Sequence, residues 1–195
     1  MKKIFVLLII SLIICPLCFA EENTDYQSMK KQGILLYSQN EIKSAYEIFI
    51  NIPEKERDSE VYLLLGNIAQ DKNNPLEAIY HLQKAINVDY RNYKAYYNLG
   101  NLYLEDNKLN AAIKNYEKAI KYNPEFAYSY YNLGICEYKL QDYKKAKRYF
   151  VKAMLKKQNE PDFYYNLALT YQKLNNEPKA KEAMDTYTKL KNEEL

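Results

Sequence analysis

The four glycines of this 195-residue chain lie at regular intervals. They are Gly33, Gly66, Gly100 and Gly134, and Ala168 continues the series at the same interval. Glycine inside a helix costs ~1 kcal/mol relative to alanine, so confinement of every glycine to one column implies that something approaches the backbone there. The expected neighbour is a second helix, and a period of about 34 residues predicts a repeated helical unit.

Five segments share one layout: 26–58, 59–92, 93–126, 127–160 and 161–194. The third segment shows it most clearly, because apolar and small residues recur there at the i, i+3, i+4, i+7 spacing of one helix face. In its first helix these residues are Tyr96, Leu99, Gly100 and Tyr103, and in its second helix they are Ala112, Tyr116 and Ala119. Each segment is therefore predicted to form a helix, a turn and a second helix.

This pattern resembles the tetratricopeptide repeat family, with Tyr96 in place of the usual tryptophan and Pro124 closing the unit. The other segments match in part, and the first is degenerate, because Met29 and Gln32 do not fit. The resemblance implies an all-α fold, a right-handed superhelical solenoid of about five helix–turn–helix repeats whose first helices line the concave side. It also implies that the protein binds other proteins or peptides.

The turns between the paired helices carry a second regular feature. The corresponding positions hold Asn40, Asn73, Asn107, Gln141 and Asn175. Asparagine is the non-glycine residue best suited to the left-handed conformation that ends a helix, so we expect that conformation there. Prolines fall where helices should begin: Pro75 and Pro178 at second helices, and Pro161 at a first helix.

The first twenty residues have the composition of a signal peptide. Lys2 and Lys3 precede the apolar run 4–14, and Cys18-Phe19-Ala20 places small residues before Glu21. We therefore expect a signal peptide at 1–20, a short N-terminal segment at 21–25, a solenoid at 26–195, and export to the periplasm or the exterior. The alternatives are a lipoprotein or an uncleaved anchor, and membrane association is expected only through such a leader or lipidation.

The composition argues against several classes of protein. His81 is the single histidine and the glycines are few, so a histidine metal cluster, a glycine-rich phosphate loop and a dinucleotide fingerprint lack their residues. No nucleophile, base and orienting group can be assembled, so the sequence predicts a non-enzymatic protein without a cofactor. The chain has 28 Lys+Arg against 25 Asp+Glu, and two of the lysines lie in the leader, so no nucleic-acid partner is expected.

A stripe on the first helices lies outside the predicted hairpin core. In segment 93–126 it is turned roughly 130° from the core stripe, at 100° per residue. Tyrosine suits binding surfaces because it offers a large apolar face and a hydroxyl at small entropic cost. The predicted groove residues are Tyr37, Asn67, Tyr97, Asn101, Tyr128, Tyr131, Tyr138 and Tyr165. The alternative is that these tyrosines are the usual residues of the repeat, and we expect Asn98, Asn132 and Asn166 to bond to the neighbouring repeat or to solvent.

The second helix of the fourth segment is strongly basic. Lys144, Lys145, Arg148 and Lys152 form a predicted secondary patch for an anionic partner. The alternative is a solvated outer helix face. Two single residues complete the predictions: Cys136 is expected to be a buried structural thiol facing the preceding repeat, and His81 a surface residue.

Together these features predict an exported scaffold that binds a protein or extended peptide in a tyrosine-lined groove. Two other functions stay open from the sequence. The chain could be a self-associating structural subunit, which concentration-dependent mass would reveal, or it could bind glycans such as cell-wall material, which titration with soluble wall fragments would reveal.

Overall fold

The computed structural model describes the backbone of residues 16–193 and the side chains of residues 26–193. Most of the predicted signal peptide, 1–20, lies outside the described residues. Helix α1 spans Pro16–Ser38 and so crosses the predicted cleavage position before Glu21. None of the helices in the described part combines the length and hydropathy that a bilayer crossing requires.

Internal contacts divide the chain into two compact units, 1–56 and 57–195. In the first unit α1 packs against α2, Ile42–Asn51, and a short 3-10 helix follows at Glu54–Glu56. Ala45 and Phe49 of α2 are fully buried. The described part of the first unit, from residue 16 onward, is therefore one helical hairpin followed by a short 3-10 helix.

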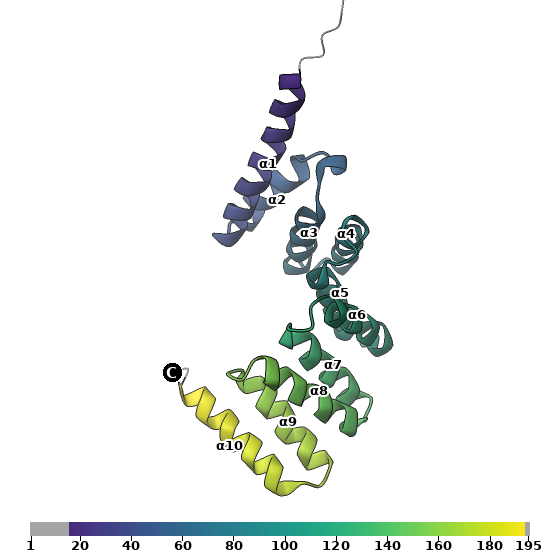
Figure 1. Ribbon diagram of the computed structural model, residues 1–195, viewed down its shortest axis with the longest axis vertical. Coiled ribbons are helices and arrows are strands. Elements are labelled where there is room, and N and C mark those ends of the chain that lie inside the picture. Colours follow the sequence, from purple (N-terminus) through teal and green to yellow (C-terminus); the bar gives the residue numbers. More distant parts are fainter. Residues whose placement is uncertain (1–15, 194–195) are drawn as a thin grey trace, which may run out of the picture. The chain divides into compact units, whose positions relative to one another are not determined.

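The second unit contains four helical hairpins (Figure 1). Its helices are α3 Ser59–Asp71, α4 Pro75–Val88, α5 Tyr93–Glu105, α6 Leu109–Tyr122, α7 Ala127–Lys139, α8 Tyr143–Lys156, α9 Pro161–Lys173 and α10 Glu177–Glu193. The described residues contain helices and no strand. The all-α repeat fold expected from the sequence is confirmed.

The helices of the second unit form two layers. The first helices α3, α5 and α7 each contact the next first helix, and α4, α6 and α8 each contact the first helix of the following hairpin. Within the described residues, the second helices do not pack against one another to the degree that successive first helices do. The first helices are therefore more closely spaced than the second helices, which places them on the inner side of the stack.

Each glycine lies directly against a large side chain of its partner helix. A Cβ atom added at Gly100 would lie 2.5 Å from a ring carbon of Tyr116, and one added at Gly134 would lie 2.7 Å from a ring carbon of Phe150. Phe49 and Leu82 occupy the same position beside the other two glycines. The prediction that a second helix approaches the backbone at the glycine column is confirmed.

The turns also follow the sequence prediction. The five residues between paired helices all have positive φ, from 55° to 63°, and they are Asn40, Asn73, Asn107, Gln141 and Asn175. The backbone N–H groups of the neighbouring residues bond to carbonyls of the preceding helix end, as where Lys108 N donates to Tyr103 O at 2.8 Å. Pro75 and Pro161 open their helices, and Pro178 is the second residue of α10.

Cys136 is completely buried, and its neighbours include Ala112 and Tyr116 of the preceding hairpin. Burial raises the pKa of its thiol to about 12. The prediction of a buried thiol facing the preceding repeat is confirmed.

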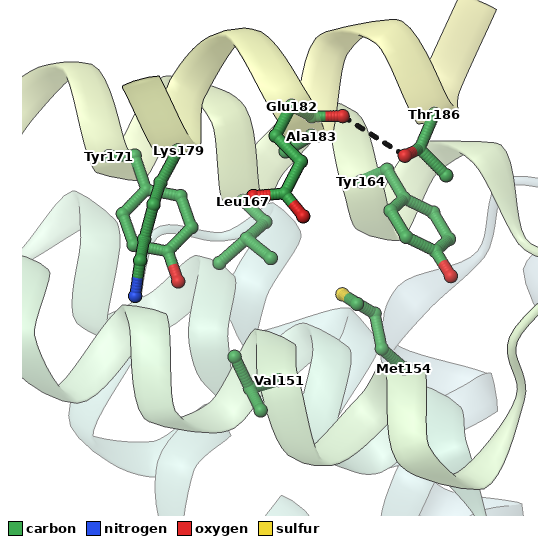
Figure 2. A pocket seen from close by; sticks show the side chains of 9 residues that line it. All are labelled: Val151, Met154, Tyr164, Leu167, Tyr171, Lys179, Glu182, Ala183 and Thr186. Carbon is green, nitrogen blue, oxygen red and sulfur yellow. Dashed lines mark hydrogen bonds between the residues drawn. The ribbon is translucent and has the colours of Figure 1, made fainter. Parts of the chain in front are cut away.

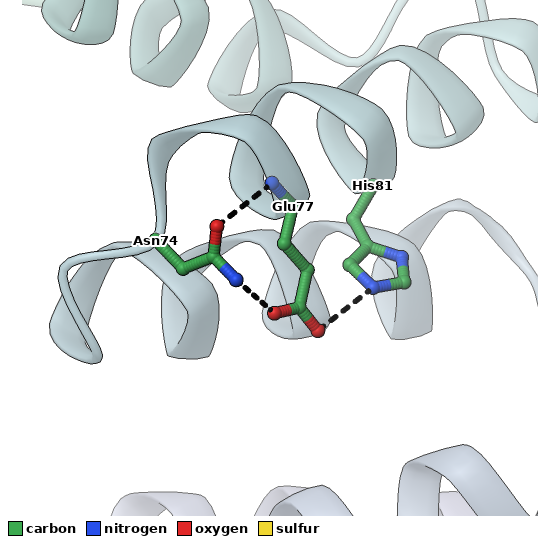
Figure 3. A network of polar contacts seen from close by, with 3 residues as sticks. All are labelled: Asn74, Glu77 and His81. Atoms are coloured by element: carbon green, nitrogen blue, oxygen red, sulfur yellow. Dashed lines mark hydrogen bonds and ion pairs between the residues drawn. The ribbon is translucent and has the colours of Figure 1, made fainter.

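The prediction that His81 is a surface residue is wrong, since the side chain is buried, with 8% of its surface exposed. It lies on the same stripe of α4 as Ala78 and Leu82, and its ring centroid is 5.1 Å from that of Tyr80. Its Nε2 is 3.7 Å from a carboxylate oxygen of Glu77, whose other oxygen accepts from Asn74 Nδ2 (Figure 3). The prediction assumed that the outer part of the second helix faces solvent, whereas the His81 side chain packs against its neighbours on α4.

The glycine contact predicts the effect of filling it. Gly100→Ala should destabilise the protein by about 1–2 kcal/mol, because overpacking against the buried Tyr116 ring outweighs the ~1 kcal/mol gain in helix propensity. Urea unfolding followed by circular dichroism measures this. In a Tyr116→Ala background, which removes the ring opposite Gly100, the same change should be neutral or stabilising. A stabilising Gly100→Ala in the parent protein would contradict the packing account.

Candidate functional site

The candidate site is the inner surface of α3, α5, α7 and α9, called here the first-helix face. It carries seven of the eight predicted groove residues, those from Asn67 to Tyr165. Tyr37 instead lies on α1 of the first unit, where it is half-buried. The site is therefore built within residues 57–195.

Asparagine amides connect successive first helices. Asn98 Nδ2 donates to Asn67 Oδ1 at 2.6 Å, and Asn132 Nδ2 donates to Asn101 Oδ1 at 2.8 Å. Asn132 Nδ2 also lies 3.3 Å from the hydroxyl oxygen of Tyr97. Partly buried bonds of this kind fix how one repeat is placed on the next. Asn67 and Asn101, which were predicted to line the groove, therefore accept hydrogen bonds that join successive repeats.

The next connection substitutes a tyrosine for the accepting asparagine. Asn166 Nδ2 donates to the hydroxyl of Tyr131 at 2.7 Å. The Tyr131 ring stacks on Phe163, with centroids 4.6 Å apart and planes at 30°. Burial raises the pKa of Tyr131 to about 12, with the negative charge of Asp162 adding to the shift. All three asparagines therefore bond to the neighbouring repeat, as expected.

Tyr97, which stands one repeat before Tyr131, also packs on a phenylalanine, but one from a different register position. Its ring meets Phe126 edge-on, with centroids 5.0 Å apart and planes at 88°. Burial is the main cause that raises the pKa of its hydroxyl. Tyr97 and Tyr131 are nevertheless only half-buried, so part of each ring still faces outward.

Tyr128 is held by a charged pair in the turn between α8 and α9. Its hydroxyl donates to Glu160 Oε1 at 2.9 Å and accepts from Lys157 Nζ at 2.6 Å. Lys157 also pairs with Glu160 and lies 4.8 Å from the centroid of the Tyr128 ring. The bond to Lys157 lowers the pKa of Glu160, and the bond to Glu160 raises the pKa of Lys157 to about 12.

The remaining two predicted tyrosines, Tyr138 and Tyr165, each make a ring contact with the second helix of their own hairpin. Tyr138 packs edge-on against Tyr143 at 5.2 Å, and Tyr165 packs against Tyr187 at 5.3 Å. Tyr165 is 41% exposed. Neither ring takes part in the hydrogen bonds between first helices described above.

The basic patch predicted on α8 is partly neutralised. Lys145 Nζ lies 3.0 Å from Asp142 and 3.7 Å from the buried Glu137, and Lys152 Nζ lies over the rings of Tyr130 and Tyr149. Lys144 and Arg148 are exposed. The positive charge available to a partner is smaller than the lysine count of this helix indicates.

Sequence reasoning missed the aromatic partners Phe126 and Phe163. At the register of Phe163 the two preceding repeats hold Ser129 and Ala95, so a small residue becomes a large one in the last repeat. That change of size could have predicted a new aromatic contact in the last repeat. Phe126 ends its segment, where Asn92 and Glu160 stand in the neighbouring segments.

Comparison with family models identifies the repeat. Models described as tetratricopeptide or TPR repeat match residues 63–114, 100–141, 127–159 and 161–194, which together exceed half of the chain. The chain belongs to the tetratricopeptide repeat family. No protein in the curated set matches it.

Solved tetratricopeptide repeat structures share the fold. A crystal structure of MamA superposes with a TM-score of 0.73 at 23% identity, covering 83% of this chain and 95% of that one. YrrB, described as a TPR protein with an unusual peptide-binding site, superposes with a TM-score of 0.68 at 21% identity, covering 83% and 84%. At this identity the likeness establishes the fold.

The asparagine contacts predict a stability effect. Asn132→Ala should destabilise the protein by about 1–3 kcal/mol, because the change leaves acceptors on Asn101 and Tyr97 without this donor in a partly buried site. Chemical unfolding gives the difference. Asn110→Ala, at an exposed position near the start of α6, is the matched control and should change stability by less than about 0.5 kcal/mol. Equal effects of the two changes would show that the asparagine contact does not hold the repeats together.

Proposed function

We propose that this protein is an exported interaction module that binds an extended peptide, or an extended segment of a protein, along the first-helix face of residues 57–195. It acts by binding and not by catalysis. The tyrosine rings provide apolar contact area, and the remaining polar groups of Asn101 and neighbouring side chains provide hydrogen bonds. Export rests on the leader pattern of residues 1–20.

One observation carries the proposal. Tyr97 and Tyr131 accept hydrogen bonds from the next repeat, and Tyr128 bonds to Glu160 and Lys157 at the end of its own repeat. Each of the three side chains nevertheless stays half-buried, so part of its surface is open to a ligand. A side chain that is already immobilised loses little entropy when a ligand packs on it. Rigid tyrosines therefore make a preorganised binding surface, beyond their part in stacking the repeats.

The length of the face favours an extended ligand. The rings come from three consecutive first helices, α5, α7 and α9, which contact one another in order. A chain lying across them would meet one aromatic position per repeat. The peptide-binding site of the structurally similar YrrB supports this mode of binding.

The test separates binding from repeat stacking. Tyr138→Ala with Tyr165→Ala removes one half-buried ring and one exposed ring, and neither takes part in the hydrogen bonds between first helices described above. This variant should stay folded and lose a partner cross-linked and captured from the envelope fraction of the source organism, with affinity reduced at least about tenfold. Direct binding measurements with the captured partner give the affinities.

A matched control removes two exposed tyrosines elsewhere. Tyr80→Ala with Tyr90→Ala changes α4 and the turn after it, where the rings are 49% and 64% exposed. This control should retain the partner. A partner held equally by both double variants would place binding outside the first-helix face and would contradict the proposal.

A further inference from the structure

The second unit has a cavity that is lined by none of the predicted groove residues. Its volume is about 260 Å³, and α8, α9 and α10 enclose it. Val151 and Met154 line it from α8, Leu167 and Tyr171 from α9, and Ala183 from α10 (Figure 2). The walls near the centre are therefore largely apolar.

The repeat register explains why this cavity exists. Ala183 stands one full repeat after Tyr149, so the two residues occupy the same position in successive repeats. The Tyr149 ring packs on the cluster that contains Leu133 and on the cluster that contains Tyr130. The charges of Glu117 and Glu137 act on its hydroxyl. In the last repeat alanine replaces this ring.

The surroundings of Tyr149 correspond position by position to the lining of the cavity. For six residues around Tyr149, the residue at the same position of the next repeat lines the cavity. Glu117 corresponds to Val151, Ile120 to Met154, Tyr130 to Tyr164, Leu133 to Leu167, Glu137 to Tyr171 and Lys152 to Thr186. The cavity is thus the space that a tyrosine ring fills one repeat earlier.

The substitutions also change the chemistry of the walls. Val151 and Tyr171 stand where the preceding repeat has two carboxylates, so the floor is less polar. The thioether of Met154 points toward the centre, and thioethers contact aromatic rings favourably (Figure 2). The carboxylate of Glu182 also points into the opening, where it can accept a hydrogen bond, and Lys179 lines the cavity beside Tyr171 (Figure 2).

We propose that this cavity is a docking site for a tyrosine side chain of a partner protein or peptide. The ring lies between Met154 and Leu167, where the molecule's own Tyr149 lies one repeat earlier, and the hydroxyl donates to Glu182. The space is sufficient, since an apolar cavity of about 150 Å³ already binds benzene. None of the predicted groove residues lines this site.

The test uses the Met154 methyl group as a reporter. Purified protein carrying ¹³C-methyl methionine is titrated with N-acetyl-L-tyrosinamide and observed by NMR. The Met154 methyl signal should shift and saturate, because the aromatic ring lies against it. N-acetyl-L-phenylalaninamide, which lacks the hydroxyl, should bind about three- to tenfold more weakly, and Glu182→Gln should reduce this difference.

Two variants with the same register provide the control. Ala183→Tyr restores the ring found at Tyr149, so it should fill the cavity and abolish the Met154 response. Asn115→Tyr places tyrosine at the same register of α6 and should leave the response unchanged. Ala183→Leu fills the space with a smaller group and serves if Ala183→Tyr does not fold.

The outcomes decide the proposal. Loss of the Met154 response in the Ala183 variants, with retention in Asn115→Tyr, supports it. An unmoved Met154 signal in the parent protein, or an equal response after the cavity is filled, overturns it. Tighter binding of the phenylalanine compound would overturn the role given to Glu182.

Discussion

The contact between each glycine and the large side chain opposite it determines how the two helices of a hairpin meet. Phe49, Leu82, Tyr116 and Phe150 all lie where a glycine Cβ would otherwise be. Because the helices approach so closely, the second helix of each hairpin covers one face of the first helix. Because that face is occupied, the stripe roughly 130° away is left for the next repeat and for ligands. The interaction surface therefore depends on the hairpin packing.

Under the proposed function, the tyrosines of that stripe both join the repeats and form the binding surface. Bonds from Asn132 and Asn166 hold the hydroxyls of Tyr97 and Tyr131, and Phe126 and Phe163 hold the rings. These contacts stack the repeats, and they also remove the rotamer freedom that a ligand would otherwise have to restrict. The same side chains can thus stabilise the solenoid and preorganise its binding surface.

The sequence was informative wherever one residue position repeats along the chain. The glycine column, the left-handed turns at Asn107 and Gln141 and the buried Cys136 follow from spacing and from the conformational preferences of single residues. Contacts between different positions were harder to predict. The burial of His81 and the bond from Asn166 to Tyr131 depend on side-chain directions across a helix interface, which periodicity alone does not specify. The cavity beside Ala183 became visible only when its neighbours were placed in space.

A direct test of the central claim, that the tyrosines of the first-helix face are built into the contacts between repeats, is the titration of Tyr131. The ¹³Cζ resonance of this residue, assigned by loss in Tyr131→Phe, reports ionisation of its hydroxyl while the protein stays folded. Burial beside Phe163 predicts a pKa of about 12, so the resonance should stay in the protonated state at pH 11. A free tyrosine ionises near pH ~10. Titration of Tyr131 at that value in the folded protein would show that its ring is not packed between the repeats, and would contradict this account.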